Sequence, residues 1–263
     1  MSLVYLNGSY LAPEEARLSV ADRGLAYGDG VFTTIKVSGG IPLFLERYLG
    51  RLGRDAASIG LLAPGEEVEA ACRGLIYRLG MKQGILKITL TRGAGSRGLS
   101  IRNVSGPTLI VSASDLPGPR PTLRAISIPD DRGALAAHKT LNYLPNVLAM
   151  LRAEEAGCEE AVFVRDGRLL EATGSNLVGM VEGHLLTPPL DGRVLGGIAR
   201  EVLLEESMIL EGELPADILG PLYCVNSVRG IEVVAELDSR SLRLDLKMRS
   251  TLDGVLARRA RCK

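Results

Sequence analysis

Residues 136–149 read Ala-Ala-His-Lys-Thr-Leu-Asn-Tyr-Leu-Pro-Asn-Val-Leu-Ala, and they join Lys139 to a pattern typical of a helix. Val147 and the leucines at positions 141, 144, 148 and 151 recur at helical spacing, which predicts one buried apolar face. Asn142 is expected to cap this helix, and Pro145 falls in its first turn, where the missing N–H costs little. In apolar surroundings a lysine amine has a lowered pKa and can act as a nucleophile or proton carrier. From this stretch alone, a structural lysine is a simpler interpretation than a reactive one: its aliphatic side chain packs along the helix start and its amine reaches water.

Composition and charge exclude several classes of protein. The 263 residues suit one large domain or two smaller ones and are enough for a substantial core. Lysine plus arginine equals 31 and aspartate plus glutamate equals 31, so the net charge does not indicate a nucleic-acid partner. No apolar run approaches the roughly 18 residues of a membrane span, and the start of the chain has no signal-peptide pattern. These observations argue against a nucleic-acid or membrane partner and are compatible with a small-molecule substrate.

The cysteines and histidines give no sign of a metal site. Four cysteines are scattered without a close pair, at positions 72, 158, 224 and 262, so we expect reduced thiols in the cytoplasm. With only two histidines, His138 and His184, a site built from several histidines is not expected.

The first half of the chain alternates strand-like and helix-like segments. An Asn7-Gly8 turn predicts an opening hairpin, and the glycine-rich loop 21–30 leads into a strand at 31–37. Helices are predicted at about 45–59 and 66–79, followed by strands at 85–90 and 108–111. The proline-rich stretch 115–121 cannot continue a helix or a strand. We therefore expect an N-terminal domain at 1–114, a linker at 115–121 and a C-terminal domain at 122–263.

The second half of the chain also mixes strands and helices. A strand at 122–128 precedes the lysine segment, and an Asp166-Gly167 turn predicts a hairpin. A second hairpin is predicted at 177–186, and a helix that Gly196-Gly197 opens runs to about 206. A strand at 222–225 and a basic helix at 245–261 complete the chain.

Three residue types in this half suit a pyridoxal phosphate site. Such a site needs a lysine, a carboxylate for the ring nitrogen and an anion hole for the phosphate. Lys139 and Glu171 supply the first two, and backbone N–H groups at the glycine-led helix can hold the anion. Arg51 from the first half can add a positive charge. Many proteins carry these features, so on their own they indicate the cofactor only weakly.

Seven motifs in a fixed order strengthen this interpretation. They are Asp22-Arg23-Gly24, Tyr27-Gly28-Asp29-Gly30-Val31-Phe32, Arg51-Leu52, Lys139 with Asn142-Tyr143-Leu144, Glu171-Ala172-Thr173-Gly174-Ser175-Asn176, Thr187-Pro188-Pro189 and Leu195-Gly196-Gly197-Ile198-Ala199-Arg200. This order, from roughly Tyr5 to Glu236, resembles the fold-type IV pyridoxal phosphate enzymes, which include aminotransferases and aminodeoxychorismate lyases. The resemblance implies an α/β (α+β) fold of two domains, pyridoxal 5'-phosphate in the cleft between them, and a homodimer.

The same resemblance implies a role for each matching residue. Lys139 is expected to bind the cofactor covalently and then to carry protons, and Glu171 to pair with the ring nitrogen. The phosphate is expected to contact Arg51, the backbone of Gly197, Ile198 and Ala199, and Asn226 or Ser227. Tyr143 is expected near the ring hydroxyl, and Ser175 with Asn176 to support the ring. Two positions depart from the family pattern: Ala199 replaces a hydroxyl residue common in aminotransferases, and Val178 replaces a frequent phenylalanine.

Three loops indicate which reaction the chain performs. Gly30-Val31-Phe32-Thr33-Thr34 resembles the lyase branch, whereas branched-chain aminotransferases usually carry glutamate after the aromatic residue. The loops 92–99 and 226–231 are also lyase-like, although lyases often have tyrosine at position 99. Leu99 stands where D-amino acid aminotransferases have a histidine. The implied reaction converts 4-amino-4-deoxychorismate to 4-aminobenzoate and pyruvate, for folate biosynthesis. Arg97, and less clearly Arg92 or Arg229, are expected to bind the substrate's carboxylates, and Thr34 to contact Lys139 or the substrate.

Two other functions fit the same residues less well. One is an aminotransferase that acts on D-amino acids or branched-chain amino acids and needs a 2-oxo acid acceptor. The other is a non-catalytic protein that binds the cofactor, although the joint presence of Lys139, Glu171 and Arg51 argues against it.

Overall fold

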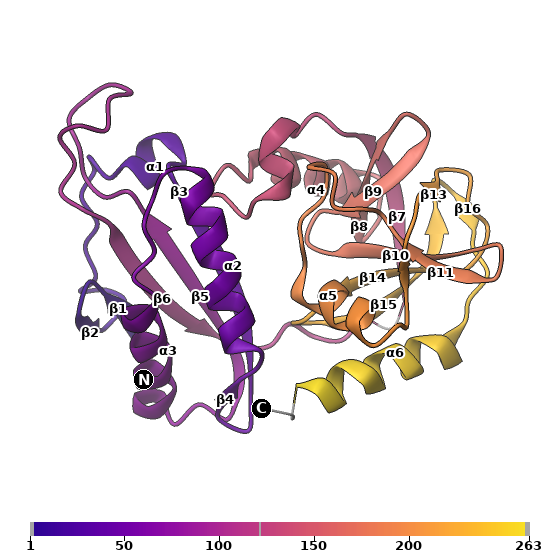
Figure 1. Cartoon of the computed structure of the whole chain (residues 1–263), viewed down its shortest axis with the longest axis horizontal. Helices are drawn as coiled ribbons and strands as arrows, with labels where there is room; N and C mark the ends of the chain where they lie inside the picture. Colours follow the sequence, from indigo (N-terminus) through magenta and orange to yellow (C-terminus); the bar gives the residue numbers. More distant parts are fainter. Residues whose placement is uncertain (1–2, 121, 261–263) are drawn as a thin grey trace. The chain divides into compact units, whose positions relative to one another are not determined.

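The computed structural model describes residues 3–120 and 122–260, which fold into two compact units (Figure 1). The first unit contains the chain up to Leu116 and also the short segment His138–Asn142. The second contains Pro117–Ala137 and the chain from Tyr143 onward. The expected domain limits at 114 and 122 stay a prediction, and residue 121 of the expected linker lies outside the described residues. The mixed α/β class expected from the sequence is confirmed.

The first unit is a six-stranded sheet with two helices packed on it. Its strand order is β2-β1-β6-β5-β3-β4, and all of these pairs are antiparallel. Helix α2 packs against β3, and α3 packs against β6 and β1 (Figure 1). The elements are β1 (Val4–Leu6), β2 (Ser9–Leu11), α1 (Arg23–Tyr27), β3 (Gly30–Ser38), β4 (Ile41–Pro42), α2 (Leu45–Ser58), α3 (Gly65–Leu79), β5 (Gln83–Thr91) and β6 (Thr108–Ser114).

Alternation along β3 decides which side chains face the helices. Val31, Thr33 and Ile35 are at most 1% exposed, whereas Phe32 and Thr34, on the opposite face, are only half-buried. On α2, which contacts β3, Tyr48, Leu52 and Ala56 recur at helical spacing and form a buried stripe. The core of this unit therefore lies between the sheet and its helices, and the other face of β3 carries Phe32 and Thr34.

The second unit is built on a ten-stranded sheet that closes on itself. Strands β10, β14, β15, β7, β8 and β9 follow one another, and a pairing between β9 and β10 closes them into a ring. The elements are β7 (Thr122–Pro129), the short 3-10 helix η1 (Gly133–Ala137), α4 (Leu144–Glu155), β8 (Glu160–Arg165), β9 (Arg168–Ala172), β10 (Asn176–Val181), β11 (His184–Thr187), α5 (Ile198–Glu205), β12 (Leu210–Glu211), β13 (Leu214–Pro215), β14 (Leu222–Asn226), β15 (Gly230–Leu237), β16 (Arg240–Ser241) and α6 (Leu246–Arg259). An aliphatic core that includes Leu177, Leu222 and Val234 lies inside the sheet.

The predicted Asn-Gly and Asp-Gly hairpin turns are confirmed, one in each unit. Asn7 and Gly8 both have positive φ, and so do Asp166 and Gly167. Turns with two positive φ values match the right-handed twist of the flanking strands, which is why Asn-Gly and Asp-Gly are favoured there. The C-terminal helix is present as α6, and its predicted end at Arg261 lies outside the described residues. Within the described ranges, no helix is long and apolar enough to cross a membrane.

The structure corrects two predictions about α4. The helix begins at Leu144 after Tyr143, so Asn142 is not its cap, and the Asn142 side chain instead donates a hydrogen bond to the Gly28 carbonyl (3.1 Å). The apolar stripe is also not buried: the residues that show about half or more of their surface are Leu144, Val147, Leu148 and Leu151. The buried stripe holds Ala149 and Ala153, whose small side chains let α4 pack closely on β7 and β8.

Because alanines form the buried face of α4, a larger side chain on that face should destabilise the protein. Ala153 is fully buried, so we expect Ala153→Leu to lower the free energy of unfolding by about 1–3 kcal/mol through overpacking. Urea unfolding followed by circular dichroism measures this change. Ala257→Leu, at an exposed position of α6, is the matched control and should change stability by no more than about 0.5 kcal/mol. Equal effects at the two positions would contradict the assignment of the buried face.

Candidate functional site

Lys139 is fixed by its backbone to the start of β3. Its carbonyl accepts a hydrogen bond from the Phe32 N–H (2.9 Å), and the Leu141 N–H donates to the Gly30 carbonyl (2.9 Å). Thr140 pairs with Val31 between these two bonds, so the segment acts as a short added strand. A Cβ at Gly30 would lie 2.8 Å from the Leu141 side chain and 2.5 Å from the Leu90 carbonyl. Only glycine leaves room for this approach, which explains one residue of the glycine-rich loop.

The side chain of Lys139 lies on the half-buried face of β3. Because Thr140 is buried opposite Val31, the alternation of the added strand turns Lys139 toward Phe32. Its Nζ is 4.5 Å from the centroid of the Phe32 ring. Thr34 occupies the same face of β3, two residues further along. The predicted grouping of Lys139 and Thr34 is therefore a grouping on one sheet face.

Lys87 is a second amine at this face that the sequence analysis did not identify. Its Nζ lies 5.2 Å from the centroid of the same Phe32 ring, and Lys87 pairs directly with Thr34 across β3 and β5. Directly opposed residues on antiparallel strands share a face. A lysine inside the otherwise apolar run 85–90 was the signal that could have drawn attention to it.

Arg51 approaches the start of β3 from the helix side. It is 6% exposed and its Nη2 donates to the Thr33 hydroxyl (2.8 Å). Its Nε lies 4.0 Å from an oxygen of Asp55, one turn further along α2. Asp55 also contacts His138 through the ring Nδ1 (3.2 Å), next to Lys139. Arg51 is thus a buried, oriented cation, which is what phosphate binding requires.

In the second unit, Glu171 and Asn176 pair at the point where β9 and β10 close the ring. Both are 6% exposed. One Glu171 oxygen accepts from the Leu195 N–H (2.9 Å) and from the Asn176 amide (3.4 Å), and the other accepts from Arg132. A buried carboxylate held by three donors has one defined orientation.

Arg132 is a further residue that the sequence analysis missed. Its Nε donates to Asp130 (2.7 Å), and its guanidinium lies 3.9 Å from the Phe163 ring while it pairs with Glu171. Nothing in the sequence spacing links positions 132 and 171, because Arg132 follows β7, Glu171 lies on β9, and both strands pair with β8. Its position shows that Glu171 belongs to an ion-pair network inside this unit.

The start of α5 is shaped to leave its backbone N–H groups open. Gly197 is the N-cap residue and makes no side-chain cap, so no side chain of its own covers the first N–H groups, which include those of Ile198 and Ala199. A Cβ at Gly197 would lie 2.0 Å from Oδ1 of Asn176, whose amide donates to the Leu195 carbonyl (2.8 Å). Glycine is therefore required here, and the positive end of the helix dipole remains available to an anion.

The remaining predicted cofactor residues lie around this start or at the base of α4. The Asn226 amide donates to the Ser175 hydroxyl (2.7 Å), and its oxygen accepts from the backbone of Val228 and Arg229. Ser227 follows Asn226 in the turn between β14 and β15. Tyr143 is half-buried at the N-cap position of α4.

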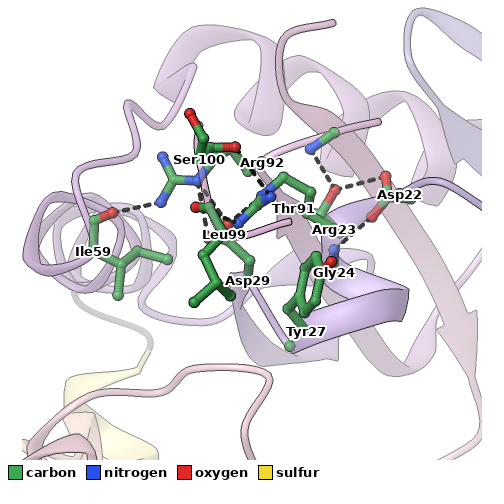
Figure 2. Close-up of polar contacts among 12 residues, drawn as sticks. Asp22, Arg23, Gly24, Tyr27, Asp29, Ile59, Thr91, Arg92, Leu99 and Ser100 are labelled. Atoms are coloured by element: carbon green, nitrogen blue, oxygen red, sulfur yellow. Dashed lines mark hydrogen bonds and ion pairs between the residues drawn. The ribbon is translucent and has the colours of Figure 1, made fainter. Parts of the chain in front are cut away.

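The three predicted substrate arginines have different surroundings. Arg92 is 8% exposed and its donors are occupied by Asp29 and by the carbonyls of Ile59 and Gly60 (Figure 2). Arg229 donates to the Gly118 carbonyl (2.9 Å). Arg97 is exposed and forms no hydrogen bond or ion pair with any other described residue. The geometry favours a structural role for Arg92 and leaves Arg97 as the best candidate to bind a carboxylate.

These residues fit pyridoxal phosphate. The second unit offers a buried, oriented carboxylate for a ring nitrogen and, for a phosphate, a helix N-terminus at which only glycine fits. The first unit offers a lysine with a fixed backbone and a buried arginine. Each unit by itself therefore offers part of what the cofactor needs: Lys139 and Arg51 in the first unit, and Glu171 with the backbone that follows Gly197 in the second. Among the described residues, no cluster of histidine, cysteine and acidic side chains suits a metal ion.

Comparison with known proteins agrees with this fit. A family model described as amino-transferase class IV matches residues 30–237. A Methanocaldococcus jannaschii protein, named as a candidate branched-chain-amino-acid aminotransferase, is 32% identical over 90% of this chain and 88% of its own. The D-alanine aminotransferase of Bacillus licheniformis is 31% identical over 77% of this chain and 74% of its own. The solved 4-amino-4-deoxychorismate lyase of Pseudomonas aeruginosa has a TM-score of 0.79 and 29% identity, with 96% of this chain and 98% of that chain covered.

Because a Cβ at Gly197 would clash with Asn176, a substitution there should weaken cofactor binding. We expect Gly197→Ala to displace the Asn176 side chain and to weaken pyridoxal phosphate binding roughly tenfold or more, because buried hydrogen bonds are lost. Titration of the cofactor-free protein, followed by absorbance, measures the affinity. Gly196→Ala is the matched control, since its added Cβ would meet Leu190 at an ordinary 3.6 Å. Unchanged affinity in Gly197→Ala would show that this helix start does not hold the cofactor.

Proposed function

The chain belongs to the class IV aminotransferase family, whose cofactor is pyridoxal phosphate, and from this premise we propose that it is a lyase. Its proposed substrate is 4-amino-4-deoxychorismate, and its products are 4-aminobenzoate and pyruvate. The reaction removes one proton and breaks one carbon–oxygen bond, and it needs no amino-group acceptor. The proposed role of the protein is therefore in folate biosynthesis.

The observation that carries this proposal is the second amine beside Lys139. Lys87 and Lys139 both lie against the Phe32 ring, at 5.2 and 4.5 Å, and Thr34 shares their face. A substrate with two carboxylates requires two cations, and Lys87 with the exposed Arg97 can provide them. A branched-chain or D-amino acid with a single carboxylate would leave the Lys87 amine without a second carboxylate to bind.

Each residue at the site has a proposed task. Arg51 and the backbone after Gly197 bind the phosphate, and Glu171 pairs with the ring nitrogen. When bound, pyridoxal phosphate supplies an electron sink for bonds at the amine-bearing carbon of the substrate. Ser175 and Asn176 are proposed to support the ring, Asn226 or Ser227 to help bind the phosphate, and Tyr143 to lie near the ring hydroxyl.

Lys139 moves the proton. Its neutral Nζ takes the proton from the ring carbon that bears the amine, and the bond from the neighbouring ring carbon to the enolpyruvyl oxygen then breaks. The substrate ring becomes aromatic. Nζ returns the proton to the departing enol, which becomes pyruvate, so Nζ is neutral again after the proton transfers. Thr34, on the same face, is proposed to orient Nζ or the substrate.

Position 33 also supports the lyase over a branched-chain aminotransferase. Thr33 occupies the position after the aromatic residue, and its buried hydroxyl accepts the hydrogen bond of Arg51. A glutamate there would place a second carboxylate next to Asp55 in the same buried space, which would require a different arrangement of Arg51.

An aminotransferase is the second candidate function, because curated relatives with 31–32% identity carry aminotransferase names. This alternative needs a 2-oxo acid as amino-group acceptor, whereas the lyase does not. The expected homodimer and cytoplasmic location stay predictions, and light scattering on the purified protein tests the first.

The lyase proposal predicts 4-aminobenzoate release from aminodeoxychorismate without any 2-oxo acid. We expect Lys139→Ala to lower this rate by about a thousandfold or more, because proton transfer by a positioned base is lost. Fluorescence of released 4-aminobenzoate follows the reaction. No release by cofactor-loaded protein, with amino transfer to a 2-oxo acid instead, would reject the lyase in favour of the aminotransferase.

Lys87→Met tests the proposed carboxylate contact in the same assay. Methionine retains the apolar stem against Phe32 but removes the charge, so KM should rise roughly tenfold to a hundredfold. Lys36→Met is the matched control, because Lys36 lies further along the same face of β3. An equal rise in both variants would indicate a general charge effect and no specific contact from Lys87.

A further inference from the structure

The loop that carries Arg97 is curled around a buried arginine from α1. Arg23 is 4% exposed, and its Nη1 donates to the carbonyls of Gly98 (2.9 Å) and Ser100 (3.4 Å). Its Nη2 donates to the carbonyl of Leu99 (3.4 Å), and Figure 2 shows Leu99 and Ser100 near Arg23. Three consecutive carbonyls, of residues 98–100, therefore accept from one guanidinium. A planar cation with donors in a fixed fork determines the curvature of such a loop.

Tyr27, at the other end of α1, holds the same loop by a different atom. Its hydroxyl accepts a hydrogen bond from the Gly98 N–H (3.2 Å), and its ring stacks on the Arg23 guanidinium at 4.9 Å. Both backbone polar groups of Gly98 are therefore engaged by α1. Gly98 has φ 111°, a conformation that favours glycine. The residue directly after Arg97 is thus fixed on both sides.

Arg23 is itself tied to the core of the first unit. Its Nε donates to Asp29 (2.8 Å), and Asp29 accepts Arg92 through both oxygens (3.0 and 2.9 Å). Burial alone raises the pKa of Asp29, but hydrogen bonds from Arg92 and Arg23 outweigh it, so its pKa lies below the ordinary value. Arg92 continues the connection to the end of α2, at Ile59 and Gly60. The loop is therefore braced against the helix that carries Arg51.

Neither Arg23 nor Arg92 is placed to bind a substrate directly. Arg23 donates to Asp29 and three carbonyls, and Arg92 donates to Asp29 and two carbonyls. A substrate carboxylate at either would have to break several buried hydrogen bonds. In contrast, Arg97 is exposed next to the fixed Gly98.

We propose that Arg23 and Tyr27 are positioning residues that hold the 96–100 loop so that Arg97 meets a carboxylate of the substrate. This proposal rests on the role of Arg97 under the proposed function and deepens it. A loop already held in place loses less conformational freedom when the substrate binds. Loss of either contact should therefore raise KM and leave kcat unchanged.

Tyr27→Phe is the mildest test, because it removes one hydroxyl and retains the ring on Arg23. Brief digestion of the cofactor-loaded enzyme with trypsin, followed by mass spectrometry, reports opening of the loop at the Arg97–Gly98 bond. We expect cleavage there to become roughly fivefold faster, the size of one hydrogen bond. Tyr77→Phe, at an 85% exposed tyrosine on α3, is the matched control and should cleave like wild type. Unchanged cleavage in Tyr27→Phe would show that the hydroxyl does not hold the loop.

Kinetics of single and double variants separate the two proposals. We expect KM to rise roughly fivefold in Tyr27→Phe at constant kcat, with no further rise when the change is added to Arg97→Ala. If Arg97→Ala leaves KM unchanged, the proposed role of Arg97 fails, whatever the loop does. If Arg97→Ala raises KM but Tyr27→Phe opens the loop without changing KM, the role of Arg97 stands and the positioning proposal is wrong. Arg23→Lys, which offers a cation without the fork, should behave like Tyr27→Phe.

Discussion

Two backbone hydrogen bonds fasten Lys139 to the first unit, from Phe32 to the Lys139 carbonyl and from Leu141 to Gly30. They place a residue from the middle of the chain beside a sheet formed by residues 4–114, and the side-chain alternation then directs Nζ to the face of Phe32 and Lys87. The absence of a side chain at Gly30 permits this approach. The main chain of Lys139 is thus held independently of the rotamers of its neighbours, and such preorganisation suits the proton transfer proposed for its amine.

A strand pairing fixes the position of the Glu171 carboxylate in the second unit. Its ring of strands closes where Glu171 meets Asn176, so the carboxylate belongs to the closure and is fixed by it. The Asn176 side chain also lies so close to Gly197 that no residue with a Cβ fits at the start of α5. The side chains proposed to contact the cofactor therefore also hold the fold together at this point. Arg132 forms ion pairs with both Glu171 and Asp130, so the Glu171 carboxylate is part of a buried charge network. Removal of one partner from such a network lowers the stability of the fold.

Local patterns in the sequence predicted much of the fold. The strand at 31–37, the helix at about 45–59 and the Asn-Gly and Asp-Gly turns each depend on neighbours within a few residues. The buried face of α4 could not be predicted in this way, because leucines and alanines both recur at helical spacing and only the packing partner decides between them. The engagement of Arg92 by Ile59 and Gly60, and the approach of Lys87 to Phe32, arise from contacts distant in sequence. Family resemblance could name candidate residues, but it could not say which arginine donors were already occupied.

The central claim is that Lys139, and no other lysine, is the residue that binds pyridoxal phosphate covalently. Its most direct test is borohydride reduction of the cofactor-loaded protein, followed by digestion and mass spectrometry of the modified peptides. The account predicts one phosphopyridoxyl group on Lys139 and none on Lys87, although both amines lie against the same ring. A modified Lys87 with an unmodified Lys139, or cofactor that leaves no covalent mark, would contradict it.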